Sequence, residues 1–198
     1  SWAWLRQRFS TYRFQCVHGQ NEMHLAARFA KDHPEYFALL KDGTRTCEPK
    51  TATGPNTYLR NMVCQSSKVW DEIYEDARAF LTGLPASVRG VPDIRRPGTF
   101  AWGGNCARQM VDVMPHDGML PCACPDCRAA YALAADPEEY ATELMWGRVA
   151  ECAQRLIDEG IPGNLTMMSY NPYKNVPDFH LPTNIVVMVC SNGAWAKE

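Results

Sequence analysis

The sequence predicts an α/β fold built on a parallel sheet, and three observations lead to that prediction. Strand-like runs alternate with stretches of helical periodicity along the 198 residues. The strand-like runs are continuously apolar, as expected of strands buried on both faces. Helices that follow such strands connect parallel neighbours. The expected elements suit an open doubly wound sheet or part of a barrel, because a closed (β/α)8 barrel typically needs about 250 residues.

Five segments have the composition of buried strands, since they are rich in β-branched, aromatic and other apolar residues. In chain order they are residues 11–19, 59–64, 109–118, 165–171 and 184–192. Polar residues or a cysteine close each of these segments. Active sites of parallel α/β folds form at the carboxyl ends of strands, so these strand ends hold the candidate site residues.

Three segments have the apolar spacing of amphipathic helices. They are residues 21–40, 66–83 and 137–159. Asn21 is a candidate cap for the first helix, and the serine pair at 66–67 for the second. Gly83 ends the second helix and Gly160 follows the third, as glycine does at many helix ends. The segment 84–108, rich in Pro, Gly and Arg, is predicted as a long loop, and such loops are often functional.

Composition excludes several classes of protein. The 20 Lys+Arg and 22 Asp+Glu give a net charge of −2, which argues against a nucleic-acid partner. With 46% apolar and 11% aromatic residues, the chain can build a core and is not expected to be disordered. No apolar run approaches the roughly 18 residues of a membrane span. The N-terminal SWAWLRQRFS lacks the features of a secretory signal, and both ends lie in core-like sequence. We expect one segment, residues 1–198, of a longer protein.

The polar residues at the strand ends are the candidates for chemistry. Asp117 is the leading candidate for proton transfer, because a carboxylate at a strand end beside His116 can donate or accept a proton. The alternative is that Asp117 only forms a turn with Gly118. Further candidates for binding a substrate are the strand-end residues His18, His116, Tyr170, Asn171 and Asn192, and Trp102 in the long loop. For His18 the alternative is a buried histidine without a role in binding.

Nine cysteines form the other conspicuous feature, and their odd number leaves at least one outside any intrachain disulfide. Cys122, Cys124 and Cys127 lie within six residues, which suits tetrahedral binding of zinc with Cys106 as the fourth ligand. A disulfide inside this loop and free buried thiols are the alternatives. A metal bound here would be structural, because catalytic zinc keeps an open position and usually has His or carboxylate ligands.

Two motifs occur together in this chain: HPEYFALLKDGTR at 33–45, and VDVMPHDG at 111–118 followed by the Cys-x-Cys-x-x-Cys loop. With NMVCQSSKVWDEI at 61–73 and LPTNIVVMVC at 181–190, they resemble a bacterial family of unknown function whose members are similar to glycoside hydrolases. The resemblance implies part of a (β/α)8 barrel, distantly similar to α-glucuronidases and β-hexosaminidases. It also implies a secreted or periplasmic protein of polysaccharide-degrading bacteria.

On this resemblance the chain would hydrolyse glycosidic bonds of a polysaccharide or glycan, with no cofactor required for catalysis. Asp117 matches the Asp of the family's Pro-x-Asp-Gly motif and is the candidate general acid, while His18 matches an early strand-end His. Where typical members have Asn, this chain has His116. Glycoside hydrolysis needs two carboxyl groups, and no second one stands out at a strand end. The alternatives are a non-catalytic carbohydrate-binding barrel and a zinc-stabilised interaction domain. Expected partners are a carbohydrate and other domains of the same longer chain.

Overall fold

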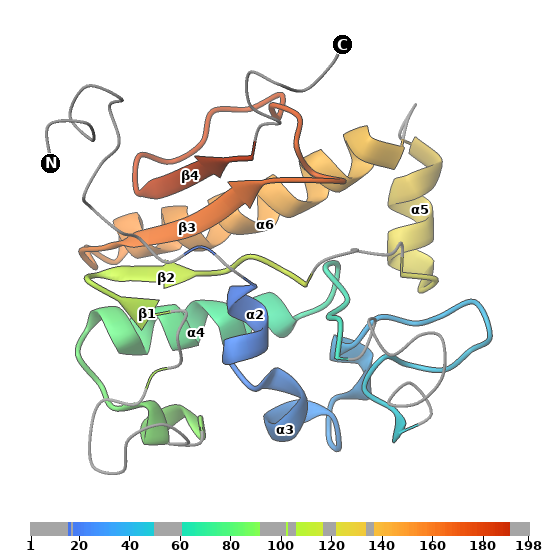
Figure 1. The fold of residues 1–198 in the computed structure, drawn as a ribbon, viewed down its shortest axis with the longest axis horizontal. Coiled ribbons are helices and arrows are strands. Elements are labelled where there is room, and N and C mark those ends of the chain that lie inside the picture. Colours follow the sequence, from blue (N-terminus) through green and yellow to red (C-terminus); the bar gives the residue numbers. More distant parts are fainter. Residues whose placement is uncertain are drawn as a thin grey trace, which may run out of the picture.

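Four strands form one open sheet in the order β1-β2-β3-β4 (Figure 1). The computed structural model describes residues 16, 18–49, 61–91, 102, 106–116, 122–133 and 137–190. Its strands are β1 (Cys106–Ala107), β2 (Met110–Asp112), β3 (Asn164–Ser169) and β4 (Ile185–Val189). Its α-helices are α2 (Gly19–Glu22), α3 (Leu25–Phe29), α4 (Val69–Leu81), α5 (Pro125–Leu133) and α6 (Pro137–Asp158). Two 3-10 segments are η1 (Pro34–Tyr36) and η4 (Ala86–Arg89).

The prediction that the chain forms part of a (β/α)8 barrel is wrong. Among the described residues, β2, β3 and β4 are the parallel strands, and β1 pairs with β2 in the antiparallel direction. Arg108 and Gln109 connect β1 to β2 in a tight turn, both with positive φ. A barrel closes only when every strand has a neighbour on both sides. In the part of the chain that the structure describes, a two-residue antiparallel strand ends the sheet on one side and β4 ends it on the other, so the fold is a small open α/β sheet.

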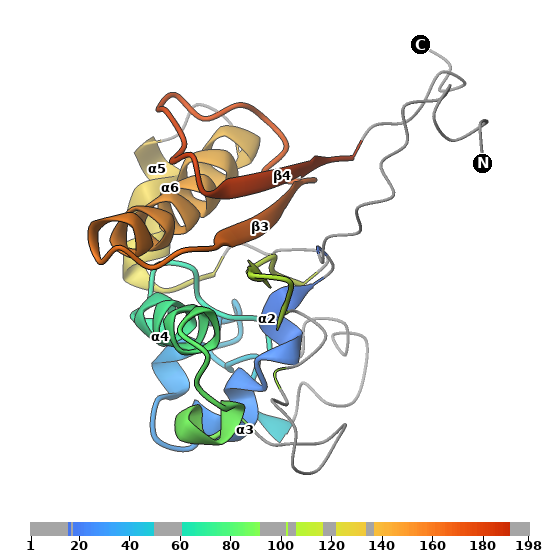
Figure 2. The same ribbon diagram turned by 90° about the vertical axis from the view of Figure 1, so that its left-hand side faces the viewer.

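The core lies between one face of the sheet and the helices α4 and α6, which Figure 2 shows on the same side of the strands. Val111 of β2 and Leu165 of β3 pack against apolar residues of these helices, and both are fully buried. This packing confirms the helices predicted over 66–83 and 137–159, and it accounts for their apolar stripes. Gly83 and Gly160 have positive φ after the helix ends, as predicted.

The helix predicted over 21–40 is wrong in extent. The segment instead forms α2, α3 and η1, and His24 interrupts it with a left-handed backbone at φ 52. Asn21 lies inside α2, and His18 is the residue that precedes that helix. The strand predicted over 11–19 lies mostly outside the described residues, and Gly19, its last residue, begins α2.

The predicted strands 109–118, 165–171 and 184–192 are present as the shorter strands β2, β3 and β4. The strand predicted over 59–64 is reduced, in the described residues, to one antiparallel bridge between Val63 and Phe37. Helix α5 was not predicted, because its short cysteine-containing sequence has little helical pattern. In the part of the chain that the structure describes, no helix is long and apolar enough to cross a membrane.

Candidate metal centre

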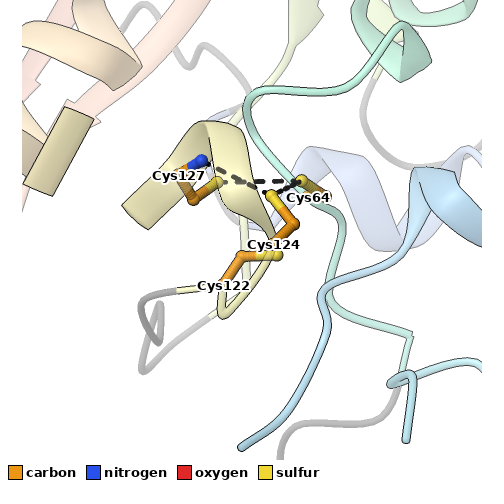
Figure 3. Close-up of side chains that lie close together, drawn as sticks. All are labelled: Cys64, Cys122, Cys124 and Cys127. Carbon is orange, nitrogen blue, oxygen red and sulfur yellow. Dashed lines mark hydrogen bonds between the residues drawn. The ribbon is translucent and has the colours of Figure 1, made fainter. Parts of the chain in front are cut away.

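Four cysteine side chains converge next to α5 (Figure 3). Cys64 lies between the bridge at Val63 and helix α4, Cys122 and Cys124 lie in the segment before α5, and Cys127 lies in the first turn of α5. All four are buried, with exposed fractions of 9% or less. Their sulfur atoms all lie within 4.8 Å of one another, close enough to hold a metal ion.

The HPEYFALL segment holds the cysteine-bearing segments together. The Cys64 amide donates a hydrogen bond to the Tyr36 carbonyl at 2.8 Å, and the Ala123 amide donates to the Leu39 carbonyl, also at 2.8 Å. Residues 36–39 therefore lie between two segments that are far apart in the sequence and bond to both. This arrangement gives the motif a structural role beside the cluster.

The sulfur geometry matches tetrahedral metal binding. The Cys64 sulfur lies 3.6 Å from that of Cys124 and 3.8 Å from that of Cys127. Zinc–sulfur bonds of about 2.3 Å in a tetrahedron place the sulfurs about 3.8 Å apart. A disulfide needs about 2.05 Å. All nine cysteines are free, so the alternative of a disulfide in the loop is absent from this structure.

Hydrogen bonds favour the thiolate form of Cys122 at this site. The Leu39 amide donates to the Cys122 sulfur at 3.2 Å, and the Cys127 amide donates to the Cys124 sulfur at 3.5 Å. Hydrogen bonds from the Cys127 and Cys64 thiols lower the pKa of Cys122 to about 3. The hydrogen bonds to Cys122 and Cys127 correspondingly raise the pKa of Cys64. Thiolate is the form that binds metal, so these hydrogen bonds favour metal binding by Cys122.

Cys106, the predicted fourth ligand, is not part of the cluster. It lies on β1, in register with Val111. Among the described residues, the fourth cysteine of the cluster is Cys64 instead. Desolvation of Cys106, with the negative charges of Asp76 and Asp112 nearby, raises its pKa well above the ordinary value. Cys64 was missed because it lies 60 residues before Cys124, although it ends a predicted strand.

His18 and His116 lie together at the carboxyl edge of the sheet. The Nδ1 atom of His18 is 3.1 Å from the carbonyl oxygen of Pro115, the residue before His116. His116 lines a cavity of about 240 Å³ whose other polar side chains are those of Gln20, Asn21, His24 and Asn61. All of these side chains are imidazoles or amides, which can both donate and accept hydrogen bonds.

The backbone around this cavity is strained. His18, His24 and Asn61 have φ angles of 49°, 52° and 63°, in the left-handed region that residues other than glycine seldom adopt. Such conformations tend to cluster at binding and catalytic sites. No sequence signal indicates the strain, because histidine and asparagine are ordinary residues until their backbone angles are known.

The other predicted site residues are dispersed or lie outside the described residues. Tyr170 and Asn171 follow β3 at the carboxyl edge and do not line the cavity. Trp102, a predicted substrate-binding residue, lies at the amino edge of the sheet. Its Nε1 donates to the Leu84 carbonyl at 2.9 Å, just after α4 ends. Leu81, at the same end of α4, faces Gly163 directly before β3. Asp117 and Asn192 lie outside the described residues.

Comparisons of this chain with protein-family models, with curated proteins and with solved structures find no match. The class of this protein is therefore described from its fold and its candidate site alone. The chain is an α/β protein with an open sheet and a buried cluster of four cysteines that can hold a metal ion.

Proposed function

We propose that Cys64, Cys122, Cys124 and Cys127 bind one zinc ion and that the ion stabilises the fold. The observation that carries this proposal is the approach of four buried thiols to within 4.8 Å of one another. Four thiolates complete the tetrahedron that zinc prefers, which leaves no position for water or substrate. A structural role follows from this closed ligand set.

The packing around the cluster supports a stabilising role for the metal. The four cysteines belong to a second group of six buried residues, which is separate from the main core. The other two are Ala38 and Met62. Tyr36, Phe37 and Val63 belong to the main core, whereas the segment 122–127 contributes no residue to it. So small a second group buries little apolar surface, so metal–thiolate bonds would fasten the segment 122–127 to Cys64.

Metal analysis of protein purified without chelators tests this proposal. We expect close to one zinc per chain in the wild type and in Cys106→Ser. Cys64→Ser removes one ligand and should lower the zinc content strongly. An equal zinc content in Cys64→Ser and the wild type would contradict the proposal, as would wild-type protein kept reduced that contains no zinc.

A second candidate function, carbohydrate binding and hydrolysis, rests on the carboxyl edge of the sheet. The cavity beside His116 is lined by imidazole and amide groups, which suit the hydroxyl groups of a sugar. Asp117 follows His116 in the sequence and is proposed as the general acid. The resemblance of the two motifs to glycoside hydrolase-like proteins supports the same choice of substrate.

Two substitutions test the carbohydrate proposal. Asp117→Asn should lower the rate of glycan hydrolysis by about 10²-fold or more while the melting temperature stays nearly unchanged. Asn61→Ala should weaken glycan binding without removing zinc. Hydrolysis that is unaffected by Asp117→Asn would exclude this residue from the reaction. Glycan binding without turnover in the wild type would favour a carbohydrate-binding protein over an enzyme.

A further inference from the structure

Within the described ranges of the chain, strand β4 leaves one edge of the sheet open. The sheet order places β4 last, and its five residues pair with β3 on one side (Figure 1). Among the described residues, no strand pairs with its other side. The opposite end of the sheet is different, because β1 is an antiparallel strand of two residues and offers little edge to another strand.

The backbone of β4 presents hydrogen-bonding groups to this open edge. The Leu165 amide donates to the Asn184 carbonyl, and the Cys190 amide donates to the Ser169 carbonyl. Alternate residues of a strand bond to the same neighbour, so the even-numbered residues from 184 to 190 face β3. Val187 and Val189 therefore direct their backbone amide and carbonyl groups away from the sheet. These are the groups that an added β-strand would bond.

Two side chains of β4, those of Val187 and Val189, are also exposed to solvent. Val187 pairs in register with Met167 of β3, yet Met167 is fully buried while Val187 is 38% exposed. Val189 is 70% exposed. Parallel strands are normally covered on both faces. Five of the eight exposed large hydrophobic residues in the described part of the chain lie between positions 170 and 189: Tyr170, Val176, Phe179, Val187 and Val189.

The sequence of β4 lacks the features by which proteins block an exposed edge. Residues 183–190, TNIVVMVC, contain no charged residue and no proline. Two such strands can therefore lie side by side without repulsion between like charges. An antiparallel pair centred on Val187 would place each Val187 opposite the other and Ile185 opposite Val189, all β-branched residues that pack well across strands.

We propose that two copies of this chain associate through β4. The two strands run antiparallel about a twofold axis, and the two sheets join into one continuous sheet. The proposal depends on neither the zinc centre nor the carbohydrate site, because β4 contributes no residue to either of them.

The molar mass in solution tests this proposal. We expect the wild type to reach about twice 22.3 kDa as its concentration rises, measured by light scattering after size-exclusion chromatography. Val187→Lys places a charge at the centre of the interface and should leave a monomer with unchanged circular dichroism and zinc content. Val176→Lys is the matched control, because Val176 is 88% exposed and lies outside the strands. A wild type that stays monomeric up to about 1 mM, or a Val187→Lys variant that still dimerises, would overturn the proposal.

Hydrogen exchange locates the contact independently. The amides of Val186 and Met188 face β3 and should exchange slowly at every protein concentration. The amides of Val187 and Val189 should exchange rapidly in dilute protein and slow down as the dimer forms. If the Val187 and Val189 amides stay rapid in a sample that light scattering shows to be dimeric, the interface lies elsewhere and the proposal is wrong.

Discussion

Arg28 of α3 forms a bidentate ion pair with Asp76 of α4. Its Nη1 and Nη2 atoms donate to the two carboxylate oxygens at 2.5 and 2.8 Å, and the two side chains are only 6% and 2% exposed. Arg89 of η4 donates to the same carboxylate at 3.0 Å. One buried carboxylate thus joins three elements that are separate in the sequence.

Asp76→Asn should destabilise the protein by about 3–5 kcal/mol, because it leaves the buried Arg28 without its counter-charge. Urea unfolding followed by circular dichroism measures the change. Asp71→Asn is the control: Asp71 pairs with Arg155 at 2.9 Å, but the two side chains are 63% and 42% exposed, and such pairs contribute about 0–1 kcal/mol. Similar losses in the two variants would show that the buried pair has no special role.

Gly19→Ala should be strongly destabilising, since a Cβ atom there would lie 1.8 Å from the carbonyl oxygen of Asp112. The backbone of α2 must move away from β2 to relieve that contact. Gly147→Ala provides the opposite case, because Gly147 lies within α6 and a Cβ atom there has no neighbour within 4 Å. Alanine is favoured over glycine in a helix by about 1 kcal/mol, so this variant should be more stable. Melting temperatures that move in the same direction for both variants would show that the space around the two Cβ positions does not decide their stability.

The sequence was informative where the pattern is regular and local. The apolar stripe of α4 and the continuous apolar runs of β3 and β4 predicted those elements because such patterns depend only on near neighbours. The left-handed angles of His18 and His24 have no comparable pattern in the sequence, although histidine adopts this region more often than most residues do. The fourth ligand was missed for the same reason, because Cys64 reaches the cluster only after residues 36–39 bring its segment beside α5.

The cysteines outside the cluster should differ in reactivity toward thiol reagents. Burial is the main cause that raises the pKa values of Cys16 and Cys152 to about 12, so at pH 8 only about one such thiol in ten thousand is a thiolate. Cys190 is exposed. In the native protein we expect Cys190 to be modified first by a maleimide, with Cys16 and Cys152 protected until urea unfolds the chain. Mass spectrometry after digestion identifies the labelled sites, and early labelling of Cys16 would contradict the burial of its side chain.

Removal of the metal should loosen one region rather than unfold the whole protein. The main core between the sheet and the helices α4 and α6 contains none of the four ligands, whereas the smaller group around Ala38 and Met62 consists mostly of them. A cavity of about 650 Å³ borders Cys64 and Cys124 and would give a chelator a path to a bound ion. Treatment with a strong chelator under reducing conditions should therefore expose four additional thiols to maleimide and make residues 122–127 sensitive to protease. The helical circular dichroism signal should persist because α4 and α6 remain folded, and adding one equivalent of zinc should again protect the four thiols from maleimide.

Complete loss of the helical signal on chelation would show that the centre supports the entire fold. Unchanged thiol protection would show that no metal holds these segments.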